Sequence, residues 1–185
     1  MLKARSIRVA TEWYKLSSMT NPFNQSALLK PGMPAPDFTL PDQSDQPVQL
    51  SGLLQKGWVA LFFYPKDHSP ICTTQVCAFR NAYHEFQEAG AEVLGISADS
   101  VASHQQFTQS QRLPFTLLSD PNGDVAARYG VLKTFGLIPG RVTFVIDPQG
   151  VIRMAYPSQF NAKAHMEKAL SLLKHSKGSP TEPVG

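Results

Sequence analysis

The sequence predicts an α/β domain in which helices flank a mixed central β-sheet, with a β-hairpin at its N-terminal end. Three observations support this prediction. Trp58–Tyr64 is a nearly continuous apolar run, which is typical of a central strand covered on both faces. Beyond this run, strand-type and helix-type hydrophobic periods alternate along the chain. The 185 residues are 42% hydrophobic and 17% charged, so the chain can bury one sizeable core and is not entirely disordered.

The folded domain is expected to begin near residue 31. Lys30–Pro36 contains three prolines, which block a helix and favour an extended segment. Asp37–Leu40 and Pro47–Leu50 are short apolar–polar alternations around a polar turn. These two segments predict the N-terminal hairpin.

The segment that begins at Pro70 predicts a helix that ends at Gly90. Its apolar residues recur at spacings of four, three, four and three, which places them on one helical face. They are Cys72, Val76, Phe79, Tyr83 and Phe86. We expect the aromatic members to belong to the core rather than to a cofactor site.

The remaining elements complete the alternation. We expect strands at 92–97, 116–118, 142–146 and 151–155, helices at 101–111 and 122–129, and a closing helix with Ala162, Met166, Ala169 and Leu173 on one stripe. Asp147–Gly150 predicts a turn between the last two strands. This order gives a thioredoxin-like topology. The irregular loop 130–141, with Gly136, Pro139 and Gly140, is a candidate border of a functional site.

The positive charge lies mainly in the first 30 residues, which hold five Lys or Arg against one Glu, while the rest of the chain is close to neutral. This distribution argues against nucleic-acid binding, and no apolar run is long enough for a membrane-spanning helix. We expect 1–30 to be a basic tail or targeting segment, 31–175 the folded domain and 176–185 a C-terminal tail. A transit peptide, a start at Met19 and a disordered arm stay open for the first segment. The expected location is the cytoplasm, or the plastid if 1–30 is a transit peptide.

Cys72 and Cys77 are the only cysteines, which argues against a secreted disulfide framework. Cys72 falls in the first turn of the predicted helix, where free backbone N–H groups and the helix dipole favour a thiolate. Ser69 is placed to reach this sulfur or a bound oxygen, although it is equally suited to cap the helix. Pro65 would cover one side of the Cys72 sulfur.

These residues resemble the peroxiredoxin family. The segment Pro65-x-x-x-Ser69-x-x-Cys72 matches the family pattern of proline, serine or threonine, and cysteine. Further blocks are similar to the Q-type, or bacterioferritin-comigratory, subfamily: 63–67, Cys72-Thr73-x-x-x-Cys77, 95–100, 113–115 and 140–147. The resemblance spans about 31–174. It implies a thiol peroxidase without a cofactor that reduces hydrogen peroxide and organic hydroperoxides.

The resemblance also implies residue roles. Cys72 is the peroxidatic cysteine, whose thiolate attacks the hydroperoxide and becomes a sulfenic acid. Arg141 supports the thiolate and the charge on the departing oxygen. Ser69 orients the peroxide and Pro65 shields the thiolate from water. Cys77 is the resolving cysteine.

Resolution requires the helix to open. Five residues along an α-helix rise about 7.5 Å and turn about 140°, whereas a disulfide needs Cα atoms within about 7 Å. We therefore expect residues 72–79 to unwind after oxidation, so that Cys77 condenses with the sulfenic acid into an intramolecular disulfide. The resemblance suggests a thioredoxin-type or glutaredoxin-type reductant, and we expect a monomer or weak dimer.

The match has three departures from the usual pattern: Ser69 replaces threonine, Ile71 stands where glycine is usual, and His68 is atypical. Ile71 is expected to narrow the pocket or to favour lipid hydroperoxides.

Three other functions are alternatives to a thiol peroxidase. A metal site at His68, Cys72, Cys77 and His84 is disfavoured because one helix would point these side chains apart. A thioredoxin-fold binding module would have inert, buried cysteines. A protein disulfide oxidoreductase normally needs Cys-x-x-Cys, and this chain has Cys-x₄-Cys. The four histidines His84, His104, His165 and His175 are expected on solvated helix faces.

Overall fold

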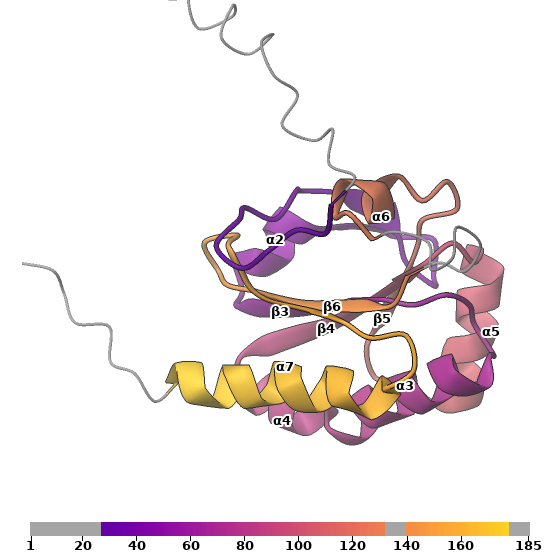
Figure 1. Ribbon diagram of the computed structural model, residues 1–185. Helices are drawn as coiled ribbons and strands as arrows, with labels where there is room; N and C mark the ends of the chain where they lie inside the picture. The colour runs from indigo at the N-terminus through magenta and orange to yellow at the C-terminus, as the bar shows by residue number, and fades with distance from the viewer. Residues whose placement is uncertain (1–26, 132–139, 178–185) are drawn as a thin grey trace, which may run out of the picture.

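The computed structural model describes residues 27–131 and 140–177 (Figure 1). Its centre is a five-stranded sheet in the order β5-β4-β3-β6-β7. The strands are β3 (Trp58–Phe63), β4 (Ala91–Ser97), β5 (Thr116–Ser119), β6 (Val142–Ile146) and β7 (Ile152–Pro157). The β3, β4 and β5 strands run parallel, whereas β6 and β7 are antiparallel to their neighbours. The mixed sheet predicted from the sequence is confirmed.

Helices cover both faces of this sheet (Figure 1). One layer contains α3 (Pro70–Asn81), α4 (Tyr83–Glu88) and α7 (Ala162–Lys177). The other contains the short helices α2 (Leu50–Leu54) and α6 (Asp124–Arg128). The α5 helix (Val101–Gln111) lies near the β5 edge, and its Phe107 packs into the core shared by α3, α4 and α7.

The β3 strand separates two cores because its side chains alternate between the two faces. Ala60 and Phe62 face the core beneath α3, α4 and α7, whereas Leu61 and Phe63 face the core beneath α2 and α6. All four are buried, which explains why the strand is apolar along its whole length. The central strand predicted at Trp58–Tyr64 is confirmed.

The hairpins are also confirmed. The β1 strand (Thr39–Pro41) pairs antiparallel with β2 (Pro47–Gln49), and Asp42 accepts hydrogen bonds from backbone amides inside their turn. In the β6–β7 turn, Asp147 accepts from the amides of Gln149 and Val151. Gly150 completes that turn at a φ of 77°, a conformation that favours glycine.

The helix expected to run unbroken to Gly90 is interrupted, so that part of the prediction is wrong. Ala82 leaves helical geometry at φ −98° and ψ 4°, and its N–H is shared between the carbonyls of Ala78 and Arg80. The break separates α3 from α4. Phe79 and Phe86 stay buried on either side of it, so the apolar periodicity does not reveal the interruption.

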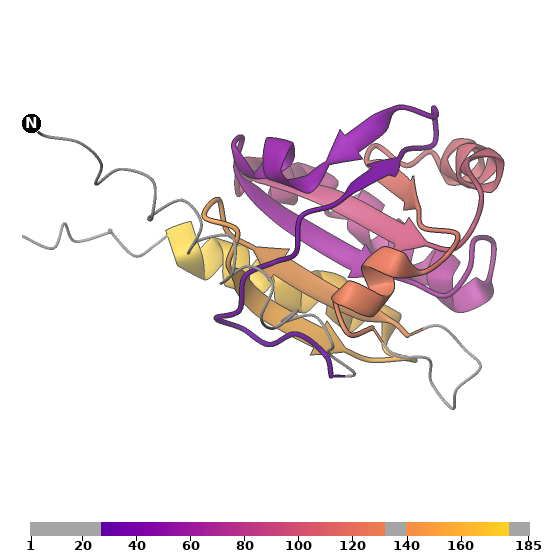
Figure 2. The same cartoon turned by 90° about the horizontal axis from the view of Figure 1, so that it is seen from above.

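The N-terminal segment crosses from β7 toward the hairpin (Figure 2). Backbone hydrogen bonds join Gly32 and Met33 to Ile152, and Leu29 is buried with its N–H donating to the carbonyl of Tyr129. Within the described residues, no helix has both the length and the hydropathy needed to cross a membrane.

Candidate active site

Cys72 lies in the first turn of α3, as the sequence predicts. Pro70 opens the helix, and the first helical hydrogen bond runs from the Thr73 N–H to the Ser69 carbonyl at 2.8 Å. The Cys72 side chain has no exposed surface. The helix thus places a fully buried sulfur at its N-terminal end, where the helix dipole favours negative charge.

Arg141 contacts this sulfur from the loop that precedes β6. It lies immediately before β6, is 3% exposed, and its Nη2 donates to Cys72 Sγ at 3.2 Å. Its Nη1 donates to Gln75 Oε1 and its Nε donates to the Gln159 carbonyl at 3.1 Å. A permanently charged guanidinium is therefore fixed against the thiol sulfur by two further acceptors.

Gln75 is a site residue that the sequence reasoning missed. It lies three residues after Cys72, and a residue at that spacing shares a helical face with it. Its side chain is fully buried, and among the described residues its Nε2 has no hydrogen-bond partner. A polar residue on an otherwise apolar helix face was the available signal.

Pro65 and Ser69 lie in the loop between β3 and α3, and both are half-buried. Ser69 occupies the N-cap position of α3, but its hydroxyl donates to the Lys66 carbonyl at 3.0 Å and caps no helical N–H. The helix-capping interpretation of the Ser69 side chain is therefore wrong. Its hydrogen bond instead closes the loop on itself just before Cys72.

Cys77 is half-buried further along α3, and both cysteines are free thiols. Its Sγ lies 3.5 Å from Gln111 Oε1 at the end of α5. Arg80 donates to the Gln111 carbonyl at 2.7 Å, which ties the same helix end to α3. With α3 intact, the structure does not bring Cys77 into bonding contact with Cys72.

His104 is fully buried, so its predicted place on a solvated helix face is wrong. Its Nδ1 lies 2.9 Å from the carboxylate of Asp67, and its Nε2 lies 3.1 Å from the Leu118 carbonyl. Burial opposes ionisation of Asp67, but hydrogen bonds from His104, Tyr64 and Ser103 outweigh it and lower the pKa of this carboxyl. A side chain with two internal partners needs no solvent, which explains the burial.

His165 is also fully buried, contrary to the same prediction. Its Nε2 donates to the Ser158 carbonyl and its Nδ1 accepts from the Thr143 hydroxyl, both at 2.8 Å. Burial lowers the pKa of His165 to about 4, and the nearby charge of Arg141 acts in the same direction. His84 and His175 are exposed, as predicted.

The residues considered for a metal site do not assemble into one. Across 27–131 and 140–177, no three His, Cys, Asp or Glu side chains are grouped to hold a metal ion. Gly136 and Pro139 of the loop considered as a site border lie outside the described residues. Gly140, at the end of that loop, lines a hollow of about 320 Å³ together with Arg141, Ser158 and Gln159.

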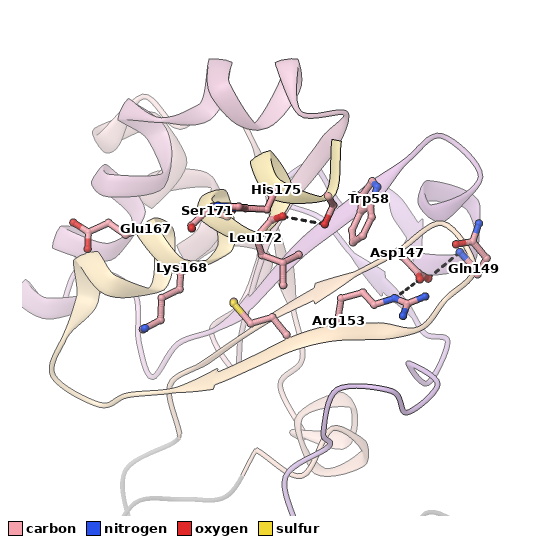
Figure 3. Close-up of a pocket in the computed structure, with 11 residues that line it drawn as sticks. Trp58, Asp147, Gln149, Arg153, Glu167, Lys168, Ser171, Leu172 and His175 are labelled. Carbon is pink, nitrogen blue, oxygen red and sulfur yellow. Dashed lines mark hydrogen bonds and ion pairs between the residues drawn. The ribbon is translucent and has the colours of Figure 1, made fainter. Parts of the chain in front are cut away.

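A larger hollow of about 1110 Å³ lies elsewhere, between α7 and the β6–β7 hairpin (Figure 3). Trp58, Arg153 and Leu172 help to line it. Trp58 begins β3, whereas the loop to Cys72 leaves the other end of that strand. This larger hollow is therefore separate from the cysteine site.

The chain is similar to known proteins in both sequence and structure. Residues 31–155 match the AhpC/TSA family model. The chain is 45% identical over 166 residues to peroxiredoxin Q, chloroplastic, from Arabidopsis thaliana, covering 85% of this chain and 76% of that protein. It is 41% identical to peroxidoxin BcpB from Mycobacterium tuberculosis, with a TM-score of 0.75 over 80% of this chain and 97% of that one. The bacterioferritin comigratory protein of Xanthomonas campestris, described through its alkyl peroxide reduction activity, is 29% identical with a TM-score of 0.70, covering 82% of this chain and 99% of that one.

Proposed function

Because this chain belongs to the AhpC/TSA family as a Q-type peroxiredoxin, it is a peroxidase, and we propose that Cys72 is the sulfur that reacts with the hydroperoxide. The contact between Arg141 Nη2 and Cys72 Sγ at 3.2 Å carries this proposal. It joins a helix N-terminus and a permanent cation at one buried thiol, and both favour the thiolate that must attack. Cys77, further along α3, has Gln111 rather than a cation as the partner of its sulfur among the described residues.

The proposed first step transfers one oxygen atom to sulfur. The Cys72 thiolate attacks the terminal oxygen of ROOH, a sulfur–oxygen bond forms and the oxygen–oxygen bond breaks. The leaving RO⁻ takes a proton to become an alcohol, or water when R is hydrogen, and Cys72 becomes a sulfenic acid. Arg141 is placed to stabilise charge that moves from sulfur to the leaving oxygen.

The substrates are proposed to be hydrogen peroxide and organic hydroperoxides. Two exposed apolar side chains adjoin the partners of Arg141: Ile71, 39% exposed, precedes Cys72, and Phe160, 77% exposed, follows Gln159. Exposed apolar groups beside a reactive sulfur suit an apolar R group. The alkyl peroxide reduction described for the Xanthomonas campestris relative supports this substrate class.

Cys77 is proposed as the resolving cysteine. Opening of α3 would release Cys77 from Gln111 and let its thiolate attack the sulfenic sulfur, which forms the disulfide and releases water. A dithiol reductant of the thioredoxin or glutaredoxin type would then reduce this disulfide and become oxidised itself. Because resolution takes place within one chain, we propose that the protein works as a monomer or weak dimer.

The compartment is proposed to be the plastid rather than the cytoplasm. The Arabidopsis thaliana relative is named as chloroplastic, and the first 30 residues of this chain are strongly basic. Mass spectrometry of the mature N-terminus in the source cells tests this proposal. A mature chain that begins at Met1 would support the cytoplasm instead.

The roles of the two cysteines are tested by a matched pair of substitutions. Cys72→Ser should abolish both peroxide consumption and thiol oxidation. Cys77→Ser should consume about one equivalent of peroxide and then stop, because the sulfenic acid forms but is not resolved. Continued turnover by Cys72→Ser would reject Cys72 as the reacting sulfur, and continued thioredoxin-dependent turnover by Cys77→Ser would reject Cys77 as the resolver.

A further inference from the structure

A buried ion pair lies in the loop that leads to Cys72. Asp67, two residues before Ser69, is 4% exposed, and His104 on α5 is fully buried. Asp67 Oδ2 lies 2.9 Å from His104 Nδ1. Neither residue contacts Cys72 in the interactions described above, so the peroxidase chemistry alone does not account for this pair.

The hydrogen bonds satisfy both side chains of the pair. His104 Nε2 lies 3.1 Å from the carbonyl of Leu118, so that nitrogen must donate. Tyr64 Oη and Ser103 Oγ donate to the Asp67 carboxylate, each at 2.7 Å. Burial raises the pKa of Asp67, but His104 and these hydroxyls lower it overall. The buried carboxylate is thus paired and hydrogen-bonded, as a buried charge requires.

The pair fastens the loop to α5 at several points. Ser103 and His104 both bind Asp67, and one turn later the Phe107 ring packs against the His68 ring at 4.8 Å between centroids. The Asp67 N–H also donates to Asp99 Oδ2 at 2.8 Å, just before α5. His68 adopts a left-handed φ of 56°, which a non-glycine residue keeps only when its surroundings hold it.

The loop continues directly into the turn that carries Cys72. The Ser69 hydroxyl donates to the Lys66 carbonyl, and the Ser69 carbonyl accepts the first hydrogen bond of α3. Movement of Asp67 would therefore move the start of α3. Arg141 comes from β6, a separate element, so such movement would change the distance between Cys72 Sγ and the guanidinium.

We propose that Asp67 and His104 are positioning residues for peroxide reduction. Their buried ion pair fixes the β3–α3 loop to α5 and so holds Cys72 Sγ at hydrogen-bond distance from the Arg141 guanidinium. This inference rests on the proposed function of Cys72. Misplacement of a reacting group by about 1 Å can cost about 100-fold in rate, so a loosened loop should slow the peroxide reaction strongly.

The test uses Asp67→Asn, His104→Asn and the double variant, with His84→Asn as the matched control. His84 pairs with Glu88 on the surface, and its side chain is 82% exposed. Each protein is reduced and kept at a temperature where circular dichroism shows it fully folded. Two rates are then measured in a single turnover: oxidation of Cys72 by hydrogen peroxide and alkylation of Cys72 by iodoacetamide.

The two reactions separate positioning from stability. Peroxide reduction needs Cys72 at hydrogen-bond distance from Arg141, whereas alkylation, measured at a pH high enough to ionise the thiol without Arg141, needs only access to the sulfur. We expect both single variants to lose about tenfold or more in the peroxide rate while alkylation is unchanged or faster. The double variant should be no slower than the worse single variant, since one interaction is removed. His84→Asn should match the unsubstituted protein in both rates.

Peroxide rates within about twofold of the unsubstituted protein in both folded single variants would overturn the inference. Loss of activity in Cys72→Ser would leave the proposed function intact in that case. If neither charge-removing variant folds, Tyr64→Phe and Ser103→Ala each remove one neutral hydrogen bond to Asp67. Each should then slow the peroxide reaction by about threefold while sparing alkylation, and unchanged peroxide rates in both would equally overturn the inference.

Discussion

His104 and His165 are both fully buried, yet they have different partners. His104 faces two acceptors, the carboxylate of Asp67 and the carbonyl of Leu118. His165 faces a carbonyl and a hydroxyl, and burial together with the charge of Arg141 lowers its pKa to about 4, so its ring is neutral at pH 7. The difference shows that a buried imidazole can be satisfied either beside a carboxylate or by neutral groups alone.

The two histidines also support different halves of the site. His104 anchors the loop that leads to Cys72. His165 donates to the Ser158 carbonyl, and the next carbonyl, that of Gln159, accepts from Arg141 Nε. One ring thus supports the sulfur and the other supports the guanidinium, which allows the two supports to be weakened separately.

The largest expected effect on stability comes from removing the carboxylate that binds His104. Asp67→Asn removes the charged partner of a buried pair, and two hydroxyl contacts lose a carboxylate acceptor. Breaking a buried pair in this way costs about 3 kcal/mol. Urea unfolding monitored by circular dichroism measures this loss. A loss below about 0.5 kcal/mol would show that the buried pair contributes little to stability.

The neutral state of His165 predicts a pH dependence of stability. Its folded pKa of about 4 lies below the ordinary histidine value of 6.5, so the unfolded chain binds more protons between these values. Its contribution to the free energy of unfolding should therefore fall as the pH falls from 6.5 to 4, by about 2 to 3 kcal/mol in total.

The measurement compares urea unfolding of the unsubstituted protein and of His165→Asn across this pH range. The variant should show the shallower dependence, because asparagine does not titrate. Equal slopes for the two proteins would contradict a neutral, buried His165.

Arg141→Lys tests the guanidinium half of the site. Lysine keeps the charge but cannot reproduce the fork that reaches Cys72, Gln75 and Gln159 together. We expect single-turnover oxidation of Cys72 by hydrogen peroxide to slow by about 10- to 100-fold, or about 1.4 to 2.7 kcal/mol. A rate within about twofold of the original would show that charge without the fork is sufficient.

The smallest effect should come from Thr143→Val, which removes the hydroxyl that donates to His165 Nδ1. Loss of one neutral hydrogen bond to a buried group costs about 1 kcal/mol. Urea unfolding at pH 7 measures it beside Asp67→Asn. Equal losses in the two variants would show that the carboxylate partner of His104 stabilises the fold no more than the hydroxyl partner of His165.

Much of the fold was predictable because its signals are local. The apolar run at Trp58–Tyr64, the turn at Asp147–Gly150 and the helical period from Cys72 each follow from neighbours in the sequence. The break at Ala82 was not predictable, since the apolar face continues through it.

The candidate site was only partly predictable because its contacts are long-range. Cys72 could be placed at a helix start from local pattern, but Arg141 lies 69 residues away and was found only through the family resemblance. His104 was misplaced because its partner Asp67 lies 37 residues away, and no local pattern marks a polar residue as internally satisfied. Gln75 was missed for the same reason, since its partner is Arg141.

The most direct test of the central claim is to locate the first oxidised sulfur. Cys77→Ser is treated with about one equivalent of hydrogen peroxide in the presence of dimedone, which traps sulfenic acids, and its peptides are mapped by mass spectrometry. We expect one dimedone adduct, on Cys72, with a much lower yield when Arg141→Ala is added and the reaction is quenched early. Peroxide consumption with Cys72 unmodified, or an equal early yield without Arg141, would contradict that claim.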